Sequence, residues 1–184
     1  MAMMREMKLA GTLVSVVVLG FAAPTALGRS SVLASGHSGQ FVWQLTASDA
    51  RAGDGRLGFC IDFGARIPPT RRNSGGSTCF FPGDVHRNGS NGAISFGSGV
   101  GAKSHAVQAW EALVDTRATT VVITLENGRN LRARTHPLPA RFHARARLAW
   151  VVQSVPKKSL TTIRNDPVGM IAYDAAGRVV GTSP

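Results

Sequence analysis

The sequence predicts an all-β protein: an antiparallel β-sandwich of the immunoglobulin-like or a related type, with a partly open β-barrel as the alternative. Apolar and polar residues alternate in several short segments, turn signals separate these segments, and no long segment has helical periodicity. The chain of 184 residues is 43% hydrophobic, which suits one core. Only 17% of its residues are charged and 21 are glycine, which argues against coiled coils and long polar helices.

The first residues are typical of a secretory signal peptide. Arg5 and Lys8 form a short basic start, and the apolar run 9–23 follows them. This run is shorter than the roughly 20 residues that a membrane-spanning helix needs, so cleavage is favoured over a permanent anchor. We expect a secreted or extracellular protein, and a protein tethered to the membrane by the uncleaved segment is the alternative.

Small residues mark the predicted end of the signal peptide. Ala26 and Gly28 occupy the third and the last position before a cut after Gly28, and a cut after Ala34 is the second candidate. The residues that follow are rich in serine and glycine, which is typical of a flexible linker. The predicted boundaries are a signal peptide over 1–28, a linker over 29–39 and a single β-sandwich domain over 40–184.

The chain has two cysteines, Cys60 and Cys79. In an oxidising exterior a lone pair of cysteines is most simply one disulfide, and we predict this pairing. On the chain-entropy model, a disulfide that closes a loop of this length contributes about 3 kcal/mol to stability. There is no Cys-x-x-Cys spacing, so a structural role is favoured over a redox-active one.

The domain opens with two segments of alternating hydrophobicity, 41–46 and 57–64. An Asp-Gly turn signal lies between them in residues 52–55, which predicts a β-hairpin. Residues 65–90 are rich in proline and glycine. They are predicted to form a loop that the disulfide ties across its middle.

The remaining segments also favour strands. Residues 93–96 suit a short strand, and 105–114 fit a strand or a helical face, of which we favour the strand. The β-branched segment 119–125 and the alternating segment 130–135 flank Asn127-Gly128, the strongest hairpin signal in the chain. Three further strands are predicted at 148–155, 168–173 and 178–181.

Several of these segments carry a resemblance to known proteins. The sequence resembles small exported β-domain proteins of high-GC Gram-positive bacteria, in which a valine-rich strand, an acidic-Gly-Arg turn, a strand that ends near a proline and a final strand of the type aYDaaGrvv recur. It departs from this pattern at Asn127, where the turn of those proteins has an acidic residue. The resemblance implies the β fold and the exported location, and no particular activity. The segments that carry it are ATTVVITLENGRNLRAR (118–134), WVVQSVP (150–156), VGMIAYDAAGRVVG (168–181), Trp43–Leu45, Leu57–Ile61 and Cys79.

No motif predicts a cofactor or a metal site. Residues 97–104 have glycines as in a phosphate-binding loop, but Ala102 stands where that loop needs a glycine before the lysine. No strand-helix-strand unit surrounds the segment. The histidines lack the paired spacing of zinc ligands, and a zinc site needs three or four ligands. We therefore expect no nucleotide cofactor and no metal. The histidines are His37, His86, His105, His136 and His143.

The charge distribution is the feature most relevant to function. Lys and Arg total 21 against 10 Asp and Glu, a net charge of +11, and no acidic residue occurs between Glu126 and Asp166. Alternation in an extended chain would place Arg132 and Arg134 on one side, and the arginines of 141–148 likewise. If these segments are neighbours, they form a basic strip on one sheet face. The predicted strip consists of Arg132, Arg134, Arg141, Arg145 and Arg147.

Such a strip would attract polyanions. Anionic cell-wall polymer, an acidic membrane surface and extracellular nucleic acid are the candidate partners. The plainer interpretation is a solvated face whose arginines protect strand edges from aggregation. The sequence thus favours a secreted, non-catalytic interaction module. The alternative is a small secreted hydrolase with its site in the loop 65–104, which would need His86 or His105 beside a carboxylate and a nucleophile.

Overall fold

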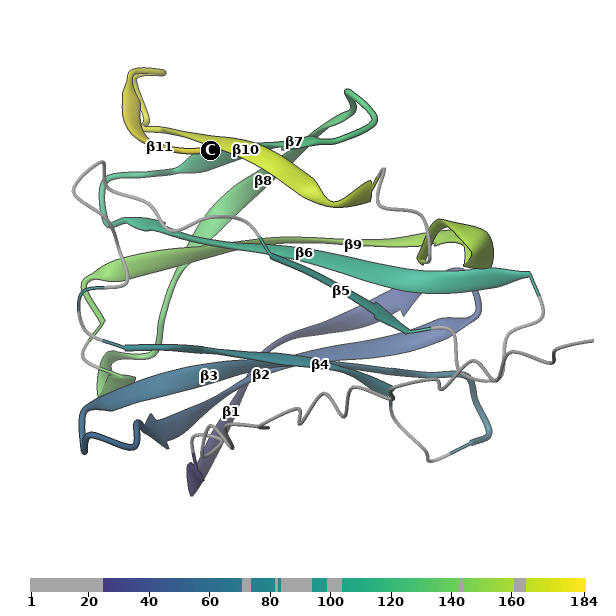
Figure 1. Cartoon of the computed structure of the whole chain (residues 1–184), viewed down its shortest axis with the longest axis horizontal. Coiled ribbons are helices and arrows are strands. Elements are labelled where there is room, and N and C mark those ends of the chain that lie inside the picture. The colour runs from purple at the N-terminus through teal and green to yellow at the C-terminus, as the bar shows by residue number, and fades with distance from the viewer. Residues whose placement is uncertain are drawn as a thin grey trace, which may run out of the picture.

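The protein is a nearly all-β molecule (Figure 1). The computed structural model describes residues 25–70, 74–81, 83, 94–98, 104–142, 144–160 and 165–184. In these residues, eleven strands form two antiparallel sheets, one of four strands and one of seven. No helix in the described ranges is long and apolar enough to cross a membrane. The apolar run 9–23 lies outside the described residues.

The four-stranded sheet has the order β1-β2-β3-β4, and the seven-stranded sheet has the order β11-β10-β7-β8-β9-β6-β5. The first sheet consists of β1 (Thr25–Ser38), β2 (Phe41–Arg51), β3 (Leu57–Arg66) and β4 (Ser74–Phe80). The second consists of β5 (Ile94–Ser98), β6 (His105–Asp115), β7 (Thr120–Leu125), β8 (Asn130–Pro137), β9 (Ala146–Pro156), β10 (Pro167–Tyr173) and β11 (Val179–Ser183). Two short 3-10 helices, η1 (Ala140–Phe142) and η2 (Lys157–Leu160), flank β9.

The predicted antiparallel β-sandwich is confirmed, and neither sheet closes into a barrel. The seven-stranded sheet folds over at β8, which the sequence did not predict. Residues 130–134 of β8 pair with β7, whereas Thr135–Pro137 pair with β9. The result is three layers in Figure 1: the four-stranded sheet, a middle layer of β5, β6 and β9, and an upper layer of β7, β8, β10 and β11.

Two hydrophobic cores fill the spaces between the three layers. The first core joins the four-stranded sheet to the middle layer and includes Phe41, Ile61, Phe63, Leu113 and Leu148. The second core joins the middle layer to the upper layer and includes Trp110, Ile123, Leu125, Leu131 and Met170.

Strand β6 belongs to both cores. Residues 106–114 are all buried, with Val107 and Leu113 in the first core and Ala106 and Trp110 in the second. A strand buried on both faces has no polar side, so it loses the alternation that identifies a strand. Segment 105–114 therefore fits both a strand pattern and a helical pattern. The structure confirms the strand that we favoured.

Both predicted hairpins are confirmed. Strands β2 and β3 pair from Arg51↔Leu57, around a turn in which Gly55 has a φ of 87°. Strands β7 and β8 pair from Thr124↔Asn130, and Gly128 has a φ of 80°. Positive φ is inexpensive only for glycine, so these two glycines suit the turns that join the strands.

The predicted linker over 29–39 was wrong. Residues Ser30–Ser38 belong to β1 and pair with Phe41–Ser48 of β2. Leu33 and Ala34 pack against the first core, and Gly36 leaves room for the Trp43 ring, because a Cβ there would lie 2.9 Å from that ring. Small residues thus serve close packing here and not flexibility.

The predicted loop over 65–90 was wrong in its middle, where Ser74–Phe80 form β4. This strand pairs with β3 through Gly75↔Gly64 and Cys79↔Cys60. A Cβ on Gly75 would collide with the backbone carbonyl of Phe63. The glycines that indicated a loop therefore allow two strands to approach closely.

Replacing Gly75 by alanine should destabilise the protein, because the backbone carbonyl of Phe63 cannot move without disturbing the β3–β4 pairing. We expect a loss of about 1–3 kcal/mol in the free energy of unfolding, measured by urea denaturation. Gly53→Ala is the matched control, because nothing lies within 4 Å of a Cβ there. Equal stability of the two variants would contradict the close approach.

Candidate functional site

The predicted disulfide between Cys60 and Cys79 is confirmed. The two residues are direct partners in the β3–β4 register, and Cys60 is buried. The bond therefore fastens β4, an edge strand, to the rest of its sheet. This position is consistent with a structural staple.

The expected extended segment over residues 141–148 was wrong at its start. Residues Ala140–Phe142 form η1, and β9 begins only at Ala146. Phe142 turns into the first core, where its ring centroid lies 5.5 Å from that of Phe59. Pro137 and Pro139 precede this turn, and a proline has no N–H with which to continue a strand ladder.

Two of the five predicted arginines make hydrogen bonds within the protein. Arg141 donates to the carbonyl of Ala47 at 3.4 Å, and its guanidinium lies over the Phe142 ring. Arg147 donates through Nε to the Thr135 hydroxyl at 2.7 Å and through Nη2 to the Thr135 carbonyl at 3.0 Å. Both side chains are half-buried. Arg147 stabilises the corner where β8 bends, whereas Arg141 links η1 to β2 of the four-stranded sheet.

The other three arginines are exposed. Arg132 and Arg134 lie on the outer face of β8, and Arg145 lies just before β9. None of the three forms an ion pair within the described part of the chain. The structure therefore brings Arg132 and Arg134 together on one face and does not gather all five residues into one strip.

Strand register defines the outer face of the upper layer. Thr120 of β7 lies between Arg134 of β8 and Tyr173 of β10. Two residues along, Val122 lies between Arg132 and Ile171. We call these six residues, with Thr124 and Asn130 in the next row, the β8–β10 face. It has arginines on one side, β-branched residues in the centre, and Ile171 and Tyr173 on the other side.

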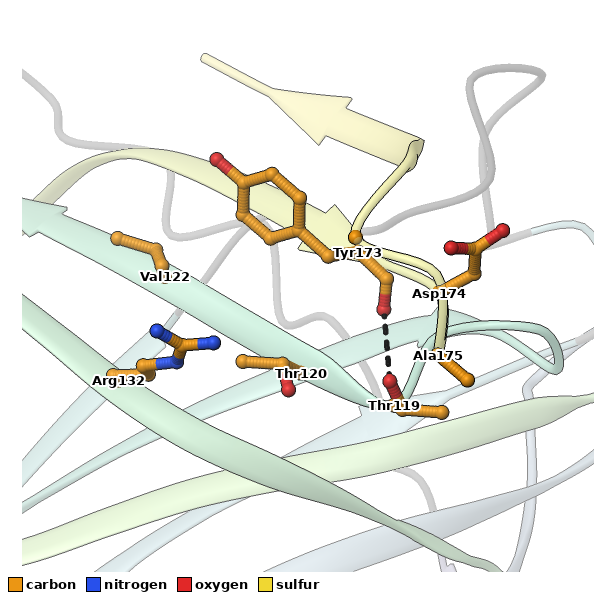
Figure 2. Close-up of a pocket in the computed structure, with 8 residues that line it drawn as sticks. Thr119, Thr120, Val122, Arg132, Tyr173, Asp174 and Ala175 are labelled. Atoms are coloured by element: carbon orange, nitrogen blue, oxygen red, sulfur yellow. Dashed lines mark hydrogen bonds between the residues drawn. The ribbon is translucent and has the colours of Figure 1, made fainter.

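A shallow groove of about 390 Å³ crosses this face. Figure 2 shows the Tyr173 ring extending over Val122, the Arg132 side chain beyond Val122, and Asp174 at the other end. A neighbouring hollow of about 440 Å³ is lined by Thr120, Arg132, Ala133 and Arg134. Arg132 therefore borders both hollows. The residues that line the groove are Thr119, Thr120, Val122, Arg132, Tyr173, Asp174, Ala175 and Gly177.

Backbone hydrogen bonds hold the groove in shape. The Thr119 N–H donates to the Tyr173 carbonyl at 2.8 Å, and the Thr119 hydroxyl donates to the same oxygen at 3.3 Å, the bond drawn in Figure 2. The N–H of Asp174 donates to the Arg178 carbonyl at 2.9 Å and closes the β10–β11 turn. The ends of β7 and β10 are thus fastened together.

Asp174 lies at one end of the groove and forms an ion pair with Arg178. The backbone N–H of Arg178 and its guanidinium, whose Nε lies 2.8 Å from Oδ2, hold the pKa of Asp174 below its usual value. The carboxylate is therefore ionised at neutral pH, and the Arg178 guanidinium neutralises it. Arg132, near the other end, carries a positive charge with no ion-pair partner among the described residues.

The sequence predicted Arg132 and Arg134 but missed Tyr173, Asp174 and the threonines of the groove. These residues reach the face only through the β7–β10 pairing, which joins segments about 50 positions apart. The alternation of Thr120 and Val122 with buried residues marked one exposed face of β7. The hairpin signal placed β8 beside β7, but nothing in the local pattern indicated that β10 lies on its other side.

The residues proposed for a hydrolase receive little support. The Ser104 hydroxyl lies 2.9 Å from Nδ1 of His105, and both residues are exposed. No carboxylate contacts this pair within the described residues. His86 and most of 82–93 lie outside those residues. Among the described His, Cys, Asp and Glu, no group of three could hold a metal ion.

Glu111 is the most unusual ionisable residue in the described chain. It is 1% exposed, and neither carboxyl oxygen has a hydrogen-bond partner among the described residues. It lies on β6 opposite Trp150 of β9, on the side of the first core. Burial, and to a smaller extent the charge of Asp62, raise the pKa of Glu111 to about 8. The carboxyl is therefore mostly neutral at pH 7.

Comparison with protein-family models, with curated proteins and with solved structures finds no match to this chain.

The buried carboxyl predicts a pH-dependent stability. The unfolded chain releases the Glu111 proton near pH 4.5, whereas the folded protein holds it to about pH 8. Between these values the folded state binds more protons, so the free energy of unfolding falls as pH rises, by up to about 1.4 kcal/mol per pH unit. Denaturant unfolding between pH 5 and pH 8 measures this slope.

Glu111→Gln keeps the size of the side chain and removes its titration, so this variant should lose the decline between pH 5 and pH 8. The carboxyls of Asp54, Asp115 and Asp174 have lowered pKa values, so their contribution appears in more acidic solution and has the opposite sign. An unchanged slope in the variant would contradict the assignment to Glu111.

Proposed function

We propose that this protein is a secreted, non-catalytic β-sandwich module of the cell envelope or extracellular space that binds anionic polymers through its β8–β10 face. The observation that carries the proposal is the position of Arg132. This residue is exposed, forms no ion pair with the described residues, and borders both hollows of the face. Arg134 stands two residues away on the same side of β8.

The electrostatics of the chain support this proposal. The net charge is +11, so the protein attracts polyanions from a distance. Two guanidinium groups on the same side of one strand can contact successive anionic groups of an extended polymer. Cell-wall polymer, an acidic membrane surface and extracellular nucleic acid all present such groups.

Secretion is supported by the basic start followed by the apolar run, and by the disulfide. Disulfides persist in oxidising compartments and are rare in the cytosol, so Cys60–Cys79 favours an exported protein. The resemblance to small exported β-domain proteins points the same way.

The double variant Arg132→Gln, Arg134→Gln should bind polyanions more weakly and with less dependence on salt. Each phosphate contact contributes a slope of about −0.7 for single-stranded and −0.9 for double-stranded DNA in log K against log salt. We therefore expect the slope to flatten by about one to two, measured by fluorescence anisotropy with labelled oligonucleotides at four salt concentrations.

Arg51→Gln, Arg56→Gln is the charge-matched control, because these exposed arginines lie at the β2–β3 turn of the other sheet. Arg145→Gln tests whether binding extends beyond the face. If the control and the Arg132, Arg134 variant lose affinity equally, the protein binds by net charge alone and the face has no special role.

The exported protein is expected to begin at Arg29. A cut after Gly28 keeps Leu33 and Ala34, which pack against the first core, whereas a cut after Ala34 removes both. N-terminal sequencing of the protein from culture medium or envelope measures the start. A protein that retains Met1, or one that starts at Ser35, would contradict this prediction.

A further inference from the structure

We infer that the groove of the β8–β10 face binds an acidic saccharide: a hydroxyl-rich sugar ring that bears a carboxylate. This inference rests on the proposed function and narrows its ligand. It follows from three features of the groove: the Arg132 guanidinium on one side, the Tyr173 ring on the opposite side, and the Thr120 hydroxyl between them.

The charge of the groove suits a sparsely charged ligand. Arg132 can bind a carboxylate through two parallel N–H donors. Asp174 lines the same groove, but the Arg178 guanidinium and the backbone N–H groups of Ala176 and Arg178 bind its carboxylate. Arg132 is therefore left as the groove's charge without an ion-pair partner among the described residues. A sugar acid carries one anionic group on each ring together with hydroxyl groups, whereas a nucleic acid strand repeats its phosphates with few free hydroxyls.

One side of the groove suits a sugar ring. Tyr173 is half-buried and lies across Thr120 and Val122 from the arginines, so it presents an apolar ring surface beside polar groups (Figure 2). An aromatic side chain in such a position packs against the apolar C–H face of a ring. Thr120 adds a hydroxyl that can donate and accept hydrogen bonds. A volume of about 390 Å³ lies within the range of small-ligand sites.

The ends of the groove are held before any ligand arrives. Thr119 makes two hydrogen bonds to the Tyr173 carbonyl, and Asp174 is held by backbone N–H groups of Ala176 and Arg178 at 2.9 Å. Fixed groups lose little conformational entropy on binding, which favours recognition of a particular ligand shape. A loosely held basic surface would bind any polyanion by charge alone.

The scarcity of aromatic residues on the face argues against nucleic acid. Single-stranded nucleic acids are bound by stacking successive bases on several aromatic side chains. The rows of the β8–β10 face contain one aromatic residue, Tyr173, among the residues that strand register places there. One ring accommodates one sugar unit, so the site is built for a local unit of a polymer and not for a series of stacked bases.

The test uses the disulfide-bonded protein that begins at Arg29, with affinity measured by calorimetry at low salt. The probes are a tetramer of galacturonic acid, a neutral galactose tetramer, a glycerol phosphate tetramer and an oligothymidylate. We expect the galacturonic acid tetramer to bind at least tenfold more tightly than the neutral and the glycerol phosphate tetramers. The neutral sugar lacks the anion for Arg132, and glycerol phosphate lacks a ring for Tyr173.

Tyr173→Leu should weaken binding of the galacturonic acid tetramer by about tenfold, and Tyr173→Phe, which keeps the ring, by less than about threefold. Neither change should weaken oligothymidylate binding. Melting temperatures of both variants establish that they fold.

If Tyr173→Leu folds and binds the acidic tetramer normally, or if glycerol phosphate or oligothymidylate binds most tightly, the saccharide inference is overturned. In those cases, a loss of binding in the Arg132, Arg134 variant still upholds the polyanion function. If none of the anionic probes binds the native protein, both proposals fail.

Discussion

The double burial of β6 is the constraint on which the rest of the structure depends. Because both of its faces are covered, the chain must supply one layer above β6 and one below. Trp110 is one residue through which β6 joins the middle layer to the upper layer. Its ring packs in the second core, and its indole N–H donates to the carbonyl of Asn165 at 2.9 Å. Asn165 lies two residues before the start of β10. The central strand thus helps to position the strand that carries Tyr173.

The bend in β8 divides the arginine-rich segment between two roles. Arg147 donates to Thr135 at the bend, and the Thr135 hydroxyl donates to the carbonyl of Ala118 at 2.6 Å. This chain of hydrogen bonds secures the corner from inside. Arg132 and Arg134 lie just before the bend and face outward. The same run of basic residues therefore stabilises the fold in one part and presents free cations in another.

The sequence predicted what local chemistry determines. Both hairpins have short turns with glycine at a positive φ, so their signals lie within a few residues. The disulfide followed from there being two cysteines. In contrast, the sequence predicts a linker and part of a loop where β1 and β4 lie. Glycine is typical of flexible segments, but Gly36 and Gly75 allow close packing within strands. The groove depends on the pairing of β7 with β10, which no local pattern specifies.

The placement of the acidic residues explains how a basic face can remain available to a ligand. Three ion pairs join an aspartate to an arginine two or four residues later: Asp54 with Arg56, Asp115 with Arg117, and Asp174 with Arg178. In each case the aspartate also accepts a backbone N–H from that arginine. These carboxylates shape turns and are neutralised by the arginines of the same turns. They are therefore not available to pair with Arg132 and Arg134, and the field above the β8–β10 face keeps the positive sign of the chain.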